Sequence, residues 1–232
     1  QVKMDDFSMG WFKGVKLTNV SYDDSTGNTS VKVRRIETQP QYASLLGGKV
    51  KLGKTVIEGP QIYLKVPESG QEEAAENDLP ATSEPSSSES AQAFPVDQIN
   101  LEVIDGSATI ELMDGVSQKV QFANIASKVQ IADAGQTSSL DLSMDVDETS
   151  KISAKGTVTP DKKGWTLKQG DFEVQVSKLQ LASLKPLFAL AGQEMDMAGE
   201  LNVDATIQIT DNQIQQLKAE AVISDFAQGT GD

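Results

Sequence analysis

The sequence predicts a mainly β protein with antiparallel strands, and three observations support this prediction. Apolar and polar residues alternate with a period of two over much of the chain. Turn signals separate the alternating runs at spacings of about 8–15 residues, which is typical of a meander. Helical spacing is confined to two short segments, and no alternating order of strands and helices indicates a parallel doubly wound sheet.

Each alternating run gives a strand one apolar and one polar face. This is the pattern of antiparallel sheets, because buried parallel strands are apolar throughout. The runs are Ile99/Leu101/Val103, Ile110/Leu112, Leu140/Leu142/Met144/Val146, Phe172/Val174/Val176, Leu201/Val203/Ala205/Ile207/Ile209 and Leu217/Ala219/Ala221/Ile223. The turn signals between them are Asp105-Gly106, Asp114-Gly115, Ala134-Gly135, residues 160–164 and Asp211-Asn212.

Two segments predict short helices. Gln41 to Leu46 reads as a helical turn that ends at Gly47-Gly48. Residues 179–191 carry an amphipathic stripe at Leu184, Leu187, Phe188 and Ala191, with Gly192 as the stop. Pro186 predicts a kink or a boundary within this segment.

An acidic insert divides the chain. Residues 67–94 hold three prolines, the run Ser86-Ser87-Ser88 and seven acidic residues with no basic one. Such a composition predicts disorder, since it buries too little apolar surface to offset its ordering entropy. We therefore expect a β segment with a short helix at 1–66, a disordered insert at 67–94 and a β-meander at 95–232. Deletion of residues 70–91 is expected to leave the fold nearly unchanged.

Composition excludes several classes of function. The 232 residues hold 20 basic and 34 acidic side chains, a net charge of −14, which argues against a nucleic-acid partner. There is no His and no Cys, so thiol and Ser-His nucleophiles, Cys/His zinc sites and disulfides are excluded. The longest strongly apolar stretch, 186–191, is too short to span a membrane. Because the chain starts at Gln1 without a leader, we expect a segment of a longer protein, with any anchor outside it.

Motifs for chemistry are weak. Residues 48–55 match G-x-x-x-x-G-K-[ST], but Val56-Ile57-Glu58-Gly59-Pro60 follows instead of the helix that a phosphate-binding loop needs. A strand edge is the better interpretation of residues 48–55. Nucleotide hydrolysis ranks third among the functions considered, after the two that are given below. Asp141, Asp145 and Asp147 read as the solvated face of a strand, since they lack the calcium-loop pattern. We predict no enzymatic activity, no cofactor and no metal.

The strand pattern alone leaves two architectures open. Two apolar faces could close on each other in a sandwich. A single curled sheet would instead leave an aliphatic groove, in which a strand of nine residues spans about 30 Å.

The ends of the chain resemble AsmA-like proteins of the bacterial envelope, which have relatives of the TamB type. The N-terminal match runs through Gly10-Trp11-Phe12-Lys13-Gly14-Val15-Lys16-Leu17-Thr18-Asn19-Val20, Val31-Lys32-Val33, Tyr42-Ala43-Ser44-Leu45-Leu46-Gly47-Gly48 and Val56-Ile57-Glu58-Gly59-Pro60-Gln61-Ile62-Tyr63-Leu64. The C-terminal match is Leu187-Phe188-Ala189-Leu190-Ala191-Gly192 followed by Ala198-Gly199-Glu200-Leu201-Asn202-Val203. The acidic insert departs from the family pattern.

This resemblance implies an elongated, curved antiparallel β-sheet with an open groove, in a periplasmic protein tethered to the inner membrane. It also implies a role in lipid transfer between inner and outer membrane or in outer-membrane biogenesis. We expect a passive hydrophobic groove for phospholipid or another acyl-chain lipid, with a surface-exposed structural or adhesive β-domain as the alternative. The groove candidates are Leu101, Val103, Ile110, Leu112, Leu140, Leu142, Met144, Leu201, Val203, Ile207 and Ile209.

Overall fold

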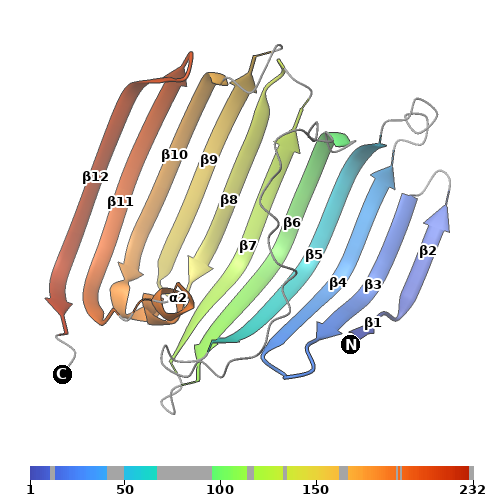
Figure 1. Cartoon of the computed structure of the whole chain (residues 1–232), viewed down its shortest axis with the longest axis horizontal. Helices are drawn as coiled ribbons and strands as arrows, with labels where there is room; N and C mark the ends of the chain where they lie inside the picture. Colours follow the sequence, from blue (N-terminus) through green and yellow to red (C-terminus); the bar gives the residue numbers. More distant parts are fainter. Residues whose placement is uncertain are drawn as a thin grey trace, which may run out of the picture.

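The chain forms one open β-sheet with a short helical segment on one face (Figure 1). The computed structural model describes residues 1–10, 14–40, 50–66, 96–113, 118–132, 135–161, 167–191, 193 and 195–229. The strands are β1 (Val2–Lys3), β2 (Asp6–Gly10), β3 (Gly14–Asp23), β4 (Thr29–Pro40), β5 (Val50–Val66), β6 (Val96–Leu112), β7 (Lys119–Ile131), β8 (Ser138–Val146), β9 (Ser150–Pro160), β10 (Leu167–Gln180), β11 (Met197–Thr210) and β12 (Gln213–Gln228). The helical elements are η1 (Leu181–Leu184) and α2 (Lys185–Leu190).

The strands lie side by side in chain order from β3 to β12, with β1 and β2 both paired to the outer edge of β3. The prediction of a mainly β fold with antiparallel pairing is confirmed, with one exception. β5 and β6 run parallel, so that Val50 pairs with Val96 and Val66 with Leu112. Val66 at the end of β5 and Val96 at the start of β6 therefore lie at opposite ends of this strand pair.

Several neighbouring strands interrupt the alternation of apolar and polar side chains. The interruptions lie at positions that are close to one another across the sheet. Asn19, Asp105 and Asn124 have left-handed φ values of 49°, 57° and 51°, and Gly59 has 60°. Arg34 lies between Asn19 and Gly59 in the register of β3, β4 and β5. We call these five residues the bulge column. Register shifts are present where β7 pairs with β6 and with β8, beside Asp105 and Asn124, whereas Asn19, Arg34 and Gly59 lie in unshifted registers.

The bulge column corrects one prediction from the sequence. Asp105-Gly106 is not a turn between two strands, since it lies inside β6. The turn predicted at Asp211-Asn212 is confirmed between β11 and β12. Several predicted segments lie outside the described residues: 114–115, Ala134, 162–164, the predicted helix at Gln41 to Leu46 and the whole acidic insert at 67–94.

The helical prediction for residues 179–191 is confirmed in part. Leu179 and Gln180 still belong to β10, and the 3₁₀ turn η1 and the helix α2 follow. Pro186 lies in the first turn of α2, where its missing N–H costs no hydrogen bond. The boundary predicted near this proline is therefore the junction of η1 and α2.

The small buried core lies beneath these helical elements. Val120, Val146 and Leu179 are buried, and Leu184 and Leu187 pack on them from the helical side. Ile110, Phe122, Ile152, Val176 and Leu201 complete the cluster. We call this cluster, with α2 and η1 over it, the sealed end of the sheet.

Candidate hydrophobic binding face

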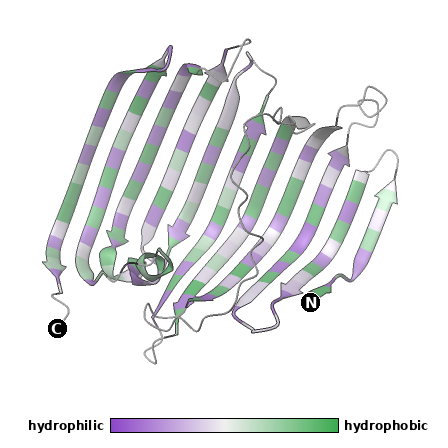
Figure 2. Ribbon diagram, viewed as in Figure 1, coloured by the Kyte–Doolittle hydropathy of each residue, from purple (hydrophilic) through white to green (hydrophobic). Residues whose placement is uncertain are grey.

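One face of the sheet is mainly apolar, with Thr38, Thr55 and Ser127 among its aliphatic residues. The strand registers define a row of residues that share this face on every strand from β12 to β2. The row is Leu217, Ile207, Phe172, Gly156, Leu140, Val129, Leu101, Thr55, Thr38, Val15 and Met9. The alternating bands of hydropathy along each strand in Figure 2 reflect the same separation into two faces. We call this side the apolar face.

All eleven groove candidates from the sequence lie on the apolar face. Leu142 shares a row with Val103 through Ser127 of β7, and with Ala205 of β11 through β9 and β10. Ile110 pairs with Val120, which lies on the same side as Val146. The registers therefore bring together residues that are more than 100 positions apart in the sequence.

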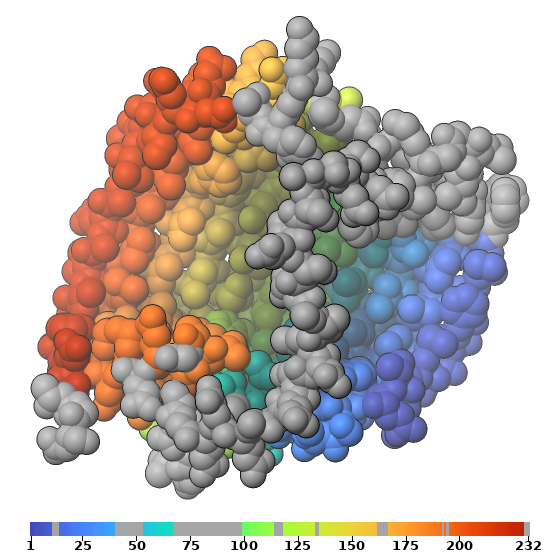
Figure 3. All heavy atoms as spheres, in the orientation of Figure 1, coloured from blue at the N-terminus to red at the C-terminus, as the bar shows by residue number. Residues whose placement is uncertain are grey.

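The candidates do not share one environment. Leu112 is buried, and Ile110 and Leu201 pack against the core cluster, so these three belong to the sealed end. The other eight are outside that cluster; Leu140, for example, is 41% exposed. We call the part of the apolar face beyond the sealed end the open span. Figure 3 views the molecule from the side that carries η1 and α2, with β12 along one margin.

Sequence reasoning missed the part of the apolar face that β3, β4 and β5 supply. Val15 and Leu17 share this face with Val20, although the spacing from 17 to 20 breaks strict alternation. The left-handed Asn19 lies between Leu17 and Val20 and interrupts the alternation there, although the register with β4 is unshifted across it. A phase shift of the apolar positions at an Asn, Asp or Gly is the sequence signal that predicts such an interruption.

The opposite face is polar and carries a network of ion pairs along the bulge column. Arg34 donates to Asp105 over 2.9 Å and lies 3.5 Å from Glu58, while Arg35 contacts the same Glu58 at 2.6 Å. Both arginine side chains therefore reach the same side of the sheet, although they are successive in β4. The guanidinium of Arg34 passes over Gly59, where an added Cβ would lie 2.9 Å from Nη2.

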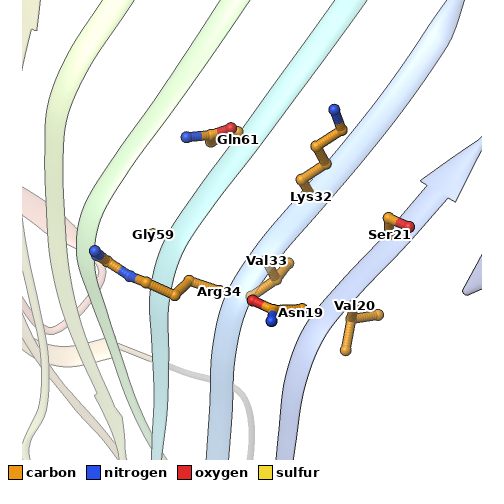
Figure 4. Close-up of a pocket in the computed structure, with 8 residues that line it drawn as sticks. All are labelled: Asn19, Val20, Ser21, Lys32, Val33, Arg34, Gly59 and Gln61. Carbon is orange, nitrogen blue, oxygen red and sulfur yellow. The ribbon is translucent and has the colours of Figure 1, made fainter. Parts of the chain in front are cut away.

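A shallow hollow of about 360 Å³ lies beside this network (Figure 4). Its lining includes Asn19, Lys32, Arg34, Gly59 and Gln61. Ser21, Val20 and Val33 complete the lining, so polar and aliphatic side chains meet in this hollow. Arg34 already has two carboxylate partners there.

Two further ionisable groups on the polar face have shifted pKa values. The hydrogen bond from Lys54, with the positive charges of Lys54 and Lys128 nearby, lowers the pKa of Glu102. The hydrogen bond from the Tyr63 hydroxyl to Glu111, over 2.6 Å, raises the pKa of Tyr63. Both contacts join side chains on neighbouring strands, and such cross-strand pairs stabilise the sheet.

The described residues show the context of the weak chemical motifs. Residues 50–55 of the phosphate-loop match belong to β5 and continue as strand to Val66, so the helix that this motif requires does not follow. Asp145 accepts a hydrogen bond from Asn124 over 2.7 Å, and Asp147 accepts one from the backbone N–H of Gln121 over 3.1 Å.

Within the described ranges, no group of three or more metal-ligating side chains comes together. No described helix has the length and apolar character to cross a membrane.

Comparison with known proteins adds no relative. No protein-family model matches the sequence, and no curated protein matches it. The resemblance to AsmA-like proteins therefore rests on the short motifs at the two ends of the chain.

Proposed function

We propose that this chain is a segment of an AsmA-like protein of the bacterial envelope and that its apolar face holds acyl chains of phospholipid or a similar lipid. The observation that carries the proposal is the mainly apolar row from β12 to β2, in which Gly156, Thr55 and Thr38 stand among aliphatic and aromatic residues. An isolated amphipathic strand is ordinary, whereas a row across so many strands gives one extended apolar surface. Large exposed apolar surfaces mark binding sites for apolar partners.

The dimensions of the open span suit an acyl chain. A strand such as β8, with nine residues, is about 30 Å long, and neighbouring strands lie about 4.8 Å apart. A saturated chain laid on this surface gains roughly 0.8 kcal/mol for each CH₂ removed from water. The aliphatic side chains along the row form no directional bonds, so a bound chain could slide without a chemical step.

The proposal assigns the protein a passive role. A curved sheet would gather the open span into a groove that runs across successive strands. In the full-length protein, a tether outside this segment would hold the groove in the periplasm, between inner and outer membrane. The function is then lipid transfer or outer-membrane biogenesis without catalysis.

The test compares two neighbouring residues of β11. Ile207 lies on the open span, and Gln208 is exposed on the polar face. Ile207→Asp should remove bound lipid while the protein stays folded, because a charge among aliphatic side chains must be desolvated when a chain passes. Gln208→Glu adds the same charge one position away and should leave lipid binding unchanged.

Two measurements decide the outcome. Mass spectrometry of organic extracts from the purified wild-type chain should detect phospholipid, and Ile207→Asp should lose it. A fluorescent fatty acid titrated onto each variant gives the affinity. Absence of lipid in the wild type, with no fatty-acid binding, would overturn the proposal and favour a surface-exposed structural or adhesive β-domain.

A further inference from the structure

The strand pair β5–β6 divides the sheet into two parts. Within the described residues, all other strand pairings are antiparallel and join strands within β1 to β5 or within β6 to β12. We call β1 to β5 the first unit, and β6 to β12 with η1 and α2 the second unit. The parallel pairing of β5 with β6, where the two units meet, is named the seam.

Polar side chains connect the two units at three levels along the seam. The contacts are an ion pair of Lys54 with Glu102, a hydrogen bond from Arg34 to Asp105 over 2.9 Å and a hydrogen bond from Tyr63 to Glu111 over 2.6 Å. Ion pairs between described residues lie from β3 to β7, and none joins two described residues of β8 to β12. The charged contacts are therefore concentrated around the seam.

The contact of Arg34 with Asp105 reaches across a whole strand. Arg34 belongs to β4 and Asp105 to β6, and Gly59 of β5 lies between them. Figure 4 shows the Arg34 side chain extending over the ribbon of β5 beside Gly59. An added Cβ at Gly59 would lie 2.9 Å from Nη2 of Arg34, so the absence of a side chain there leaves room for the guanidinium. The second unit is thus held by an inner strand of the first unit as well as by β5.

The seam also matches the two units in register. Ile57 pairs with Val103 and Leu64 with Ile110, and all four share the apolar face although each strand has seven positions between its two residues. Strict alternation would place residues seven apart on opposite faces, so both strands change phase between these pairs. A slip of two residues would misalign the two phase changes and set apolar side chains beside polar ones. The edge of β5 therefore fits the edge of β6 in one register.

Apolar contacts close one end of the seam. Val66 and Leu112 are a buried pair, and the N–H of Met113 donates to the carbonyl of Val66 over 2.9 Å. The helix α2 of the second unit contacts β5 as well as β6. The seam thus combines a buried apolar end with polar contacts along its length, which is the composition of a stable interface between two proteins.

We propose that residues 1–66 and 96–232 are two units that recognise each other through the seam and stay assembled when the chain between them is cut. The partner that fits the edge of β5 is the edge of β6, with Arg34 and Asp105 as one of the recognition contacts. The covalent connection then supplies proximity, and the seam supplies the specific pairing. This inference does not depend on lipid binding.

Site-specific cleavage of the full chain tests the proposal. A protease recognition sequence of equal length replaces residues 80–86, and the uncut form of the same variant is the control. After cleavage, the two fragments should elute together in size-exclusion chromatography and keep the far-UV circular dichroism of the uncut chain. Separate elution of the fragments, or loss of the β signal, would overturn the proposal.

The cut protein also makes the strength of the seam measurable as a dissociation constant. Asp105→Asn removes the charge that Arg34 contacts and keeps a residue that tolerates left-handed backbone. Asp145→Asn is the matched control, since Asp145 accepts its hydrogen bond from Asn124 inside the second unit. Asp105→Asn should weaken the association of the fragments about fivefold, the scale of an exposed ion pair, and Asp145→Asn should leave it unchanged. Equal dissociation constants in both variants would contradict the recognition role of Arg34 and Asp105.

Refolding kinetics give a second, independent readout. When the cut protein is diluted out of urea, both fragments must meet before the seam forms, so the refolding rate should rise with protein concentration. The uncut control should refold at a rate that does not depend on concentration. Fragments that fail to reassemble, while the uncut control refolds, would show that the seam does not suffice for recognition. Lipid is absent from these measurements, so their failure is distinguishable from failure of the proposed function.

Discussion

The sealed end and the open span of the apolar face are built from the same strands and the same alternating pattern, but their environments differ. Val146 and Leu140 of β8 lie on the same face, six positions apart. Val146 is 0% exposed beneath the helical elements, and Leu140 is 41% exposed on the open span. The comparison shows that alternation determines which side chains share a face, whereas coverage by α2 and η1 determines which of them form a core.

The largest expected effect concerns the connection between β5 and β6. The 17 residues of β5 span about 55 Å, and the parallel pairing separates Val66 from Val96 by nearly that length. Deletion of residues 70–91 would leave seven residues, 67–69 and 92–95, which reach at most about 28 Å. We therefore expect loss of the β5–β6 pairing and of cooperative unfolding, by circular dichroism and thermal melting, in contrast to the expectation from composition.

This deletion also tests the sealed end. Val66 and Leu112 are 4% and 5% exposed and pair with each other at the ends of β5 and β6. Replacement of residues 70–91 by a Gly/Ser linker of equal length is the control and should retain the fold. A shortened chain with wild-type stability would show that β5 and β6 are not parallel.

The second prediction compares the two positions of β8 directly. Val146→Asp buries an unpaired charge and should cost about 3–5 kcal/mol, a large share of a stability of roughly 5–15 kcal/mol. Leu140→Asp leaves the charge in contact with water and should cost less than about 1 kcal/mol. Urea denaturation measures both variants, and equal losses would mean that the open span is covered as well.

The third prediction concerns the helix that covers the sealed end. Leu187 of α2 packs on the core cluster, while Leu190 of the same helix is 52% exposed. Leu187→Ala should lower the free energy of unfolding by about 1–3 kcal/mol, since the site is only half-buried. Leu190→Ala should change it by less than about 0.5 kcal/mol. Similar losses of unfolding free energy in both variants would contradict the packing of α2 on the core through Leu187.

The smallest effect is expected on the polar face, at Glu102. Because Lys54 and Lys128 lower its pKa in the folded state, this carboxylate stabilises the fold above the unfolded pKa, about 4.5. The contribution is lost as the pH falls through the lower, folded value. Glu102→Gln should therefore flatten the acid limb of stability against pH slightly. Unchanged acid dependence in this variant would show that the ion pairs contribute nothing to folding.

The sequence predicted the strands best where alternation is unbroken. The run from Leu201 to Ile209 lies within β11, and the turn at Asp211-Asn212 follows it. Prediction failed at Asp105-Gly106, because a left-handed residue followed by glycine is equally compatible with a turn and a bulge. Only the pairing of β6 with β5 and β7 distinguishes the two.

By itself, the sequence determined that each strand has one apolar and one polar side, because side chains alternate along any extended chain. It also determined the acidic character and the absence of cysteine and histidine. The tertiary structure decided that the strands form one open sheet, that β5 and β6 are parallel and that α2 covers only one end. These features depend on contacts between distant residues, such as Val66 with Leu112 and Leu187 with the core, and local patterns carry no information about which distant partner a strand meets.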